Sequence, residues 1–275
     1  MFGVGVGVRV GGFTPVSSGG GFDPDAQAFF DRVTTAGGTL TTTEKNATNQ
    51  LVLDMKTAGI WSSMKAVYPM VGASAAACAQ NLKSSSFTGT FTSGWTFAST
   101  GVTGNGSSTF MNTTIIPSVS IASQDSMHLT YYANTNVKAG AFNIGVRGAA
   151  PSNTDSFIAA RFSSSQSYNA VNINTITLRS EAINVKGFLC VSRINSTTFK
   201  YYKAATIAET YTETSTALSN TYSVYVGALN LSGTLLFPDN SSCAFASIGD
   251  GLTDTQESNF YTAVQAFQTT LSRNV

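Results

Sequence analysis

The feature that most constrains the fold is an amphipathic helix near the end of the chain, directly preceded by strand-like runs. Thr253 and Gln256 form a capping box. In this motif the threonine hydroxyl accepts a hydrogen bond from a free backbone amide of the first turn, and the glutamine side chain accepts one from the backbone amide of the N-cap residue. Apolar side chains then recur at helical spacing, at Phe260, Val264, Phe267 and Leu271. Such residues share one face of a helix. We predict a helix over residues 253–272 whose apolar face packs on the preceding strands.

Three runs before this helix are rich in aromatic and β-branched side chains. They are FKYYK from Phe199, TYSVYV over residues 221–226, and CAFASIG from Cys243. These residue types suit a pleated, half-buried surface. We predict a strand from each run, with residues 227–232 as a break after the second.

From residue 87 onward the chain consists of short alternating runs, among them FTGTFTSGWTF, HLTYYANT, AFNIGVRG, SFIAARF and KGFLCVSRI. Gly, Ser, Asn or Pro separates the runs at roughly 10- to 15-residue intervals. Many short strands with regular turn signals favour two packed sheets over a parallel sheet with intervening helices. We predict a mainly β domain over residues 83–275, closed by the C-terminal helix.

The preceding segment, residues 23–82, has helical patterns. Asp23, followed by proline, is typical of an N-cap and first helical position. Thr41 and Glu44 form a capping box at the start of a second helical pattern. We predict a helical hairpin over residues 23–58.

Residues 1–22 form a Gly-rich leader with two open interpretations. Glycine alternates with valine, which suits a strand laid closely against another backbone and ordered by a partner. The later VSSGGG suits a flexible tether. No basic residue precedes the apolar part, so we do not expect a secretory signal peptide.

The runs KYYK, VGALN, AFASIGDG and LTDTQESNFYTAVQAF, in this order, resemble the end of a concanavalin A-like, laminin-G-type jelly roll. More narrowly, they are similar to the version found in tail-fibre, head-fibre and spike proteins of bacteriophages. The region from DPDAQAFFDRV to WSSMKAVYPMVG resembles the segment before the jelly roll in those proteins, so the resemblance covers residues 23–275. One departure is the hairpin after KYYK, where the family usually has Asn-Gly. This chain has Ala204 and Ala205, and neither favours the positive φ of such turns.

The resemblance implies a virion protein, assembled in the host cytoplasm and exposed on the exterior of the particle as a fibre, spike or decoration component. Its expected partners are other virion proteins, copies of itself and host-surface glycans. One alternative is a purely structural capsid or tail assembly module that binds no ligand. A glycoside hydrolase of the same fold is a further alternative.

Charged residues make up 11% of the chain and the formal net charge is +1. This balance does not predict electrostatic capture of nucleic acid or of an anionic membrane. The longest apolar run is shorter than the ~20 residues of a membrane-spanning helix, so we expect no membrane insertion.

We do not predict an enzyme. Retaining glucanases of this fold need two carboxylates about 5 to 5.5 Å apart, carried as Glu-x-Asp-x-Glu on one strand, and the chain has no such run. Glu209 and Glu213 lie in a Thr-rich stretch that we expect to be solvated. His128 is the only histidine, with Asp125 close in sequence. A catalytic triad is defined by geometry, so closeness to Asp125 in the sequence does not indicate one. We expect His128 to be a partly exposed strand-end residue.

The cysteines do not have the paired spacing of a zinc site, so we predict no metal ligand from Cys78, Cys190 or Cys243. We expect buried free thiols. A Cys190–Cys243 bridge would require neighbouring strands.

Calcium is the one cofactor that the sequence leaves open. Laminin-G-type domains can hold it with loop carboxylates and carbonyls. Asp155, Asp239 and Asp250 are loop acids, with Asn153 and Asn240 nearby. Asp250 before a glycine is equally typical of a turn, so we assign no ligands.

A glycan site needs exposed aromatic rings that stack on sugar faces. Tyr168, in the polar stretch SSSQSYN, is the strongest candidate, and Tyr131 and Tyr202 are further ones. In alternating strands about half of such rings point into the core. The predicted glycan-binding residues are therefore Tyr168, Tyr131 and Tyr202.

Overall fold

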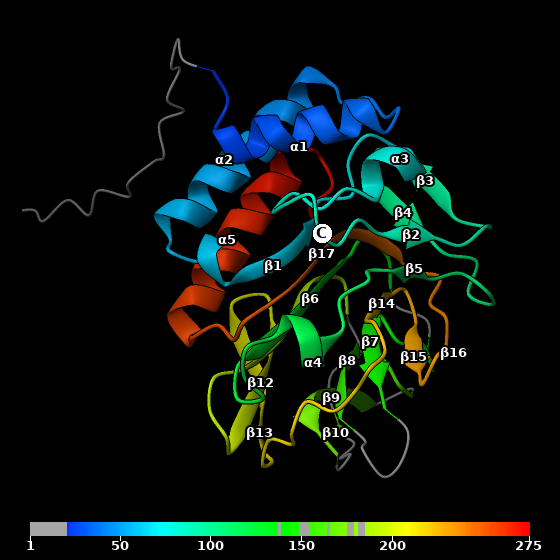
Figure 1. The fold of residues 1–275 in the computed structure, drawn as a ribbon, viewed down its shortest axis with the longest axis vertical. Helices are drawn as coiled ribbons and strands as arrows, with labels where there is room; N and C mark the ends of the chain where they lie inside the picture. Colours follow the sequence, from blue (N-terminus) through cyan, green and yellow to red (C-terminus); the bar gives the residue numbers. More distant parts are fainter. Residues whose placement is uncertain (1–20, 137–138, 149–153, 164–165, 175–178, 181–184) are drawn as a thin grey trace, which may run out of the picture.

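Two β-sheets pack face to face, and helices cover the outer face of one of them (Figure 1). The computed structural model describes residues 21–136, 139–148, 154–163, 166–174, 179–180 and 185–275. Its mainly β architecture, with helices before the sheets and one after them, confirms the predicted fold class. Residues 1–20 of the predicted leader lie outside the described residues.

The helices are α1 (Pro24–Thr35), α2 (Thr42–Thr57), the 3-10 helix η1 (Trp61–Ser63), α3 (Ala75–Cys78), α4 (Pro117–Ser120) and α5 (Asp254–Thr270). The strands are β1 (Met64–Tyr68), β2 (Thr90–Phe91), β3 (Thr96–Ala98), β4 (Gly101–Thr103), β5 (Met111–Asn112), β6 (Met127–Ala133), β7 (Ile144–Arg147), β8 (Asp155–Ala159), β9 (Gln166–Ile173), β10 (Arg179–Ser180), β11 (Gly187–Arg193), β12 (Thr198–Lys203), β13 (Thr206–Thr212), β14 (Tyr225–Val226), β15 (Leu229–Leu231), β16 (Thr234–Leu236) and β17 (Ser242–Gly249).

The 8-stranded sheet has the order β13-β12-β11-β6-β17-β4-β3, and β1 also pairs with β17. The 9-stranded sheet has the order β10-β9-β8-β7-β14-β5-β2, with β15 on β7 and β16 on β15. The described pairs are antiparallel except for β15 and β7, which run parallel. The first sheet thus takes a strand from the N-terminal segment as well as strands from the rest of the chain.

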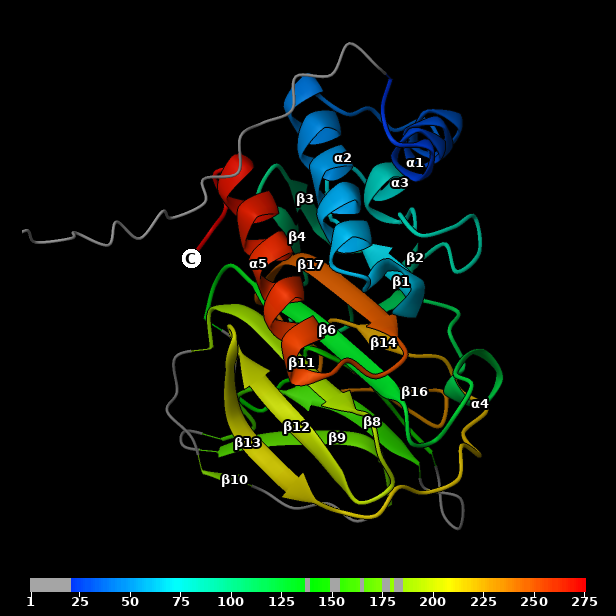
Figure 2. The ribbon, with the colours of Figure 1, turned by 90° about the vertical axis from the view of Figure 1, so that its left-hand side faces the viewer.

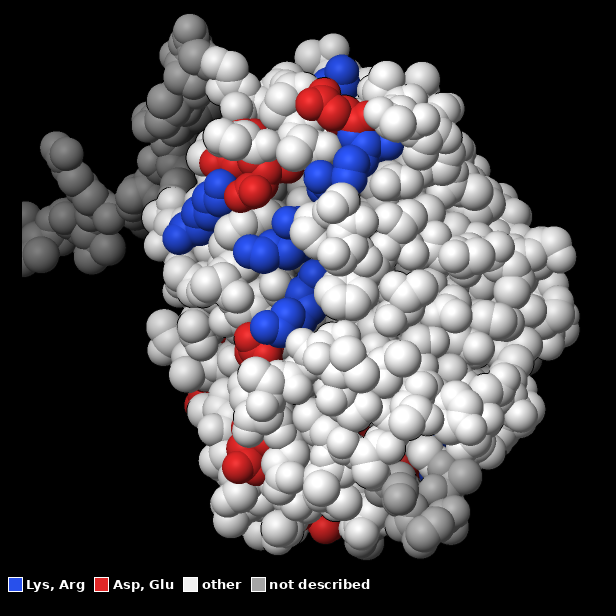
Figure 3. Space-filling view, in the orientation of Figure 1, with Lys and Arg blue, Asp and Glu red and all other residues white. Residues whose placement is uncertain are grey.

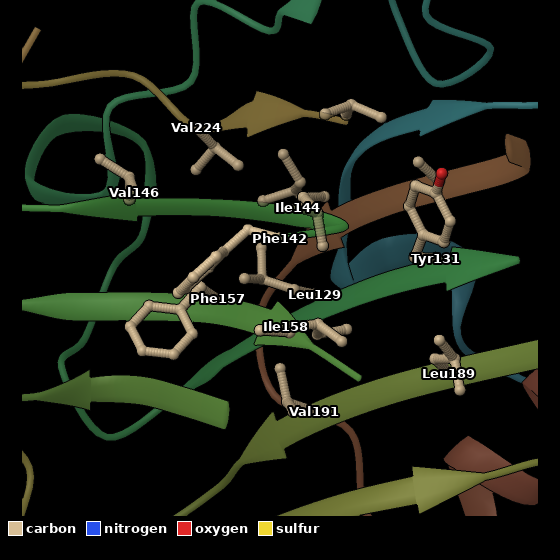
Figure 4. Packing of buried hydrophobic residues seen from close by; sticks show 14 of the residues in the cluster. Leu129, Tyr131, Phe142, Ile144, Val146, Phe157, Ile158, Leu189, Val191 and Val224 are labelled. Atoms are coloured by element: carbon tan, nitrogen blue, oxygen red, sulfur yellow. The ribbon is translucent and has the colours of Figure 1, made fainter. Parts of the chain in front are cut away.

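Alternation along the strands fills the space between the sheets. Ile144 and Ile158 of the 9-stranded sheet lie across from Leu129 and Val191 of the 8-stranded sheet (Figure 4). These side chains are fully buried. Because neighbouring residues on a strand point to opposite faces, Gly145 and Phe157 lie on the outer face of the 9-stranded sheet.

Helix α5 confirms the most constrained prediction. Thr253 is its N-cap, and its capping box with Gln256 is formed. Phe260, Val264 and Phe267 are buried in a second core, on the outer face of the 8-stranded sheet. Helix α2 lies beside α5 over this face (Figure 2).

The predicted helical hairpin is also confirmed. Asp23 caps α1, and Thr41 and Glu44 form the capping box of α2. Residues 64–68 differ from expectation, because this part of the predicted helical segment is strand β1. It pairs with β17 from Met64 to Tyr68 and fills one side of that strand next to β4.

The run over residues 221–226 differs from the predicted single strand, because only its end is the strand β14, although Val224 also exchanges backbone hydrogen bonds with Thr113 and Ile115. Gly227 follows with a φ of 80°, so the chain turns sharply there. The predicted break over residues 227–232 is therefore only in part a break, since β15 forms within it.

All three cysteines are buried and free, as predicted. Cys190 lies on β11 and Cys243 on β17, and β6 runs between these two strands. The strands are therefore not neighbours, and the bridge considered from the sequence does not form.

The hairpin between β12 and β13 forms despite its two alanines. Lys203 pairs with Thr206, which leaves Ala204 and Ala205 as a two-residue turn. Ala204 takes a φ of 53°. A side chain in this region is strained, and glycine is the usual residue at the first central position of such a turn.

We predict that Ala204→Gly stabilises the protein by about 0.5–1 kcal/mol, because relief of the positive-φ strain exceeds the entropy that glycine adds to the unfolded chain. Urea unfolding would measure the change. Ala205→Gly is the matched control and should destabilise slightly, since Ala205 does not have a positive φ. Equal effects of the two substitutions would contradict this account of the turn.

Glu257, in the first turns of α5, is a fully buried acid. Among the described residues, neither of its carboxylate oxygens has a hydrogen-bond partner. Burial, together with the negative charge of Asp254, raises the pKa of Glu257 to about 8. The folded protein therefore favours the neutral form of this side chain.

We predict that the stability contribution of Glu257 is complete below pH 4.5 and is lost as the pH rises toward about 8, because the folded pKa exceeds the ordinary one. Glu257→Gln should remove up to about 1.4 kcal/mol of this loss per pH unit. Urea unfolding at pH 5 and pH 8 would measure this effect. The free energy of unfolding of the variant should rise relative to that of the parent protein only at the higher pH. A variant with the parent's pH dependence would contradict the prediction, and Glu209→Gln on β13 serves as the control.

Candidate functional site

The structure corrects two of the three predicted glycan-binding residues. Tyr131 is 1% exposed and lies between the sheets, where its hydroxyl is 3.2 Å from Ser241 Oγ. Tyr202 is 2% exposed under α5, where its hydroxyl donates to Asp254 at 2.8 Å. Both rings point toward a packed layer, because alternation places them on the inner face and the helix-covered face of the same sheet. Neither ring can stack on a sugar.

The third residue, Tyr168, is half-buried on the outer face of the 9-stranded sheet. It lies on β9 opposite Ala159 of β8. Its ring is 4.8 Å from that of Phe157 and 5.0 Å from that of Phe162, measured between centroids. The sequence thus located one ring of a larger aromatic group.

This group, which we call the aromatic patch, consists of Phe142, Phe157, Phe162, Tyr168 and Phe237. Phe142 is its buried centre and contacts the other four rings at centroid distances of 5.0 to 6.2 Å. Phe162 and Tyr168 are partly exposed, and Phe237 is 45% exposed. Rings from three separate parts of the chain therefore meet at one surface.

Phe237 has an unusual backbone. Its φ is 51°, a conformation that bulky L-residues rarely adopt. Pro238 follows it, and a residue before proline favours extended backbone. The Phe237 ring stacks on Phe142 at 5.4 Å and an interplanar angle of 23°, and its carbonyl accepts from the Phe142 amide at 3.0 Å. Local strain of this kind is typical of functional positions.

An ion pair borders the aromatic patch on the same face. Arg147 of β7 and Asp155 of β8 are register partners, and Arg147 Nε is 3.3 Å from Asp155 Oδ2. The Arg147 side chain is 32% exposed, whereas that of Asp155 is fully buried. Burial raises the pKa of Asp155 to about 7, and the charge of Arg147 opposes this rise.

Tyr168 links the ion pair to the rings. Burial raises the pKa of Tyr168 to about 12, whereas the charge of Arg147 and a hydrogen bond with that side chain lower it and Asp155 raises it. The phenol therefore stays neutral and keeps a hydroxyl at the border between aromatic and charged groups. Such a border combines a flat apolar surface with hydrogen-bonding groups.

The candidates for hydrolysis are not assembled into a site. His128 is fully buried, not partly exposed as predicted, because β6 is flanked by β17 and covered by α5. Its Nδ1 is 2.6 Å from the Asp250 carbonyl oxygen and its Nε2 is 3.2 Å from Ser247 Oγ. Burial lowers the pKa of His128 to about 4. Asp125 instead accepts a hydrogen bond from Ser215.

The acids considered for calcium lie apart. Asp155 belongs to the ion pair, and Asp250 is 2.9 Å from Lys65 Nζ. Asp239 is buried and accepts from Ser241 and Asn143. Asn153 lies outside the described residues. Within the described ranges, no three His, Cys, Asp or Glu side chains gather as a metal site.

Charged side chains on the face shown in Figure 3 gather mainly over the helical part, and much of the remaining face is uncharged. Lys56 forms ion pairs with Asp23 and Asp25 at 2.7 Å there. Among the helices that the structure describes, none is long and apolar enough to cross a membrane.

A scan against protein-family models and a search of curated proteins find no match. Solved structures do match. Domain 4 of AbnA, a GH43 extracellular arabinanase from Geobacillus stearothermophilus in complex with arabinotriose, is 14% identical with a TM-score of 0.45, over 72% of this chain and 98% of that chain. The Ruminococcus gnavus IT-sialidase CBM40 bound to α2,3 sialyllactose is 12% identical with a TM-score of 0.36, over 48% and 78%. The NanB sialidase from Streptococcus pneumoniae is 16% identical with a TM-score of 0.38, over 52% and 25%.

Sequence reasoning missed Phe237, Phe162 and the Arg147–Asp155 pair. The available signal for Phe237 was its position directly before a proline and two polar residues, at the end of a short apolar run, where a turn is expected. The ion pair had no such signal, because only the register of β7 and β8 brings its members together.

We predict that Tyr131→Ala lowers the free energy of unfolding by about 3–5 kcal/mol, as expected for removing a fully buried ring. Tyr168→Ala should cost about 1–2 kcal/mol, since its ring is partly exposed. Chemical denaturation of the two variants tests this order. Similar losses for both would contradict the assignment of Tyr131 to the core and Tyr168 to the surface.

Proposed function

We propose that this chain binds a carbohydrate at the aromatic patch. The observation that carries the proposal is Phe237, a 45% exposed ring held in a strained backbone conformation and stacked on Phe142. An exposed aromatic ring costs solubility and this backbone costs energy, so a ligand contact would account for both. Phe162 and Tyr168 extend the apolar surface beside it.

The polar border suits a sugar better than a purely apolar ligand. Sugars offer one apolar face of C–H groups and a rim of hydroxyls, so a sugar site combines a ring platform with a few placed polar groups. The Tyr168 hydroxyl and the Arg147 guanidinium lie next to the rings and can orient ligand hydroxyls. The proposed mechanism is binding without bond cleavage.

The wider role that we propose is attachment to host-surface glycans by an exterior component of a bacteriophage particle. It is supported by the resemblance of residues 23–275 to phage fibre and spike proteins. Other virion proteins and copies of this chain are the proposed partners. Binding at the aromatic patch does not depend on this placement and can be tested on the isolated chain.

We predict that Phe237→Ala weakens glycan binding by about tenfold or more, because a central stacking ring acts as a hot spot. The measurement is a glycan array with the full chain, followed by calorimetry with the best ligand. Phe22→Ala, which removes an exposed ring beside α1, is the matched control and should bind like the parent protein.

Two outcomes would contradict the proposal. One is silence of the parent protein across a broad array, which would favour a structural assembly module. The other is a ligand whose affinity is the same for the parent protein and Phe237→Ala. Circular dichroism would verify that each variant is folded.

A further inference from the structure

The Arg147–Asp155 pair lies where it can set which sugars the aromatic patch accepts. Both side chains lie on the outer face of the 9-stranded sheet, because they alternate with Val146 and Ser156, and Val146 faces the core. Arg147 reaches the surface and Asp155 does not. A ligand at Tyr168 would therefore contact the Arg147 guanidinium directly. The Asp155 carboxylate would affect the ligand only through its charge and its hold on Arg147.

Asp155 depends unusually strongly on this one partner. In the described part of the chain, neither of its oxygens accepts a hydrogen bond, and Arg147 at 3.3 Å is its ion-pair partner. A buried carboxylate that loses its counter-charge is strongly destabilised. Asp155 therefore holds the charge of Arg147 in place.

A carboxylate on a sugar would compete with Asp155 for the same cation. If it bound Arg147, two anions would share one positive charge at a partly buried site, and like charges at this range repel. A neutral sugar does not disturb the pair, because its hydroxyls can accept from the guanidinium while Asp155 remains bound. The pair thus acts against acidic ligands.

We infer that the aromatic patch is selective for neutral glycans, and that Asp155 is the positioning residue that excludes sugars bearing a carboxylate by occupying Arg147. This inference rests on the proposed function. It adds a ligand class to that function, and it assigns the exclusion to a side chain that does not touch the ligand.

The experiment compares the full chain with Asp155→Asn on matched oligosaccharides, each neutral hexose oligomer paired with its uronate counterpart. The parent protein should bind the neutral member about tenfold more tightly. Asp155→Asn keeps the shape and removes the charge, so uronate binding should rise until the preference disappears or reverses. Arg147→Gln in the Asp155→Asn background should abolish that gain.

A second measurement uses the unmodified protein. Because the pKa of Asp155 is about 7, lowering the pH from 8 to 6 should protonate it, and the uronates stay charged. In the parent protein, the ratio of neutral to uronate affinity should therefore decrease as the pH is lowered. In Asp155→Asn the ratio should not change with pH. The part of this readout that comes from the parent protein does not depend on how well the variant folds.

Parent protein that binds uronates as tightly as neutral oligomers at pH 8 would overturn the inference and leave sugar binding at the aromatic patch standing. A pH-independent ratio in the parent protein would also overturn it. If the parent protein bound none of the oligosaccharides, neutral or acidic, the result would instead contradict the proposed function and this inference with it.

Discussion

The structure depends on the pairing of β17 with strands on both of its sides. This strand is buried along its whole length, bonds to β6 on one side, and bonds to β4 and β1 on the other. Through β1 it connects the N-terminal helical hairpin to the sheet, and its end leads directly into α5. Every backbone group of a buried strand must be paired, so removing either neighbour would leave costly unsatisfied groups.

This arrangement gives the two sheets different outer faces. Helices α2 and α5 cover the 8-stranded sheet with a second core, so aromatic residues on that face, such as Tyr202 and Phe188, are buried. The outer face of the 9-stranded sheet instead carries the aromatic patch and the Arg147–Asp155 pair. The division explains why similar aromatic strands have different roles: the layer above each face decides whether a ring is structural or accessible.

Local patterns predicted the elements that local chemistry determines. The capping boxes at Thr41 and Thr253 placed two helices correctly, because side-chain caps are formed by residues only three positions apart. Alternation of apolar and polar residues predicted the two packed sheets, because this pattern is also set by residues close together in the sequence. Strand β1 was missed because MKAVY has no turn signal of its own and becomes a strand only by pairing with β17.

The candidate site was predicted only in part, since it depends on contacts between distant residues. Tyr168 was found from its polar neighbours, but Tyr131 and Tyr202 were misplaced because sequence parity does not show which sheet face is covered. Phe237 joins the aromatic patch from a loop about 70 residues after Tyr168, and no periodicity describes such a contact. Tertiary packing therefore decided the site.

We propose that the outer face of the 9-stranded sheet is the ligand surface. Hydroxyl-radical footprinting of the full chain, with and without a saturating array-selected oligosaccharide, tests it most directly because it reports on each exposed ring. We expect protection of Phe237, Phe162 and Tyr168, with no change at Phe22 and Tyr222, two exposed rings that are not part of the aromatic patch. Protection confined to other surfaces, with the rings of the aromatic patch as reactive as before, would contradict it.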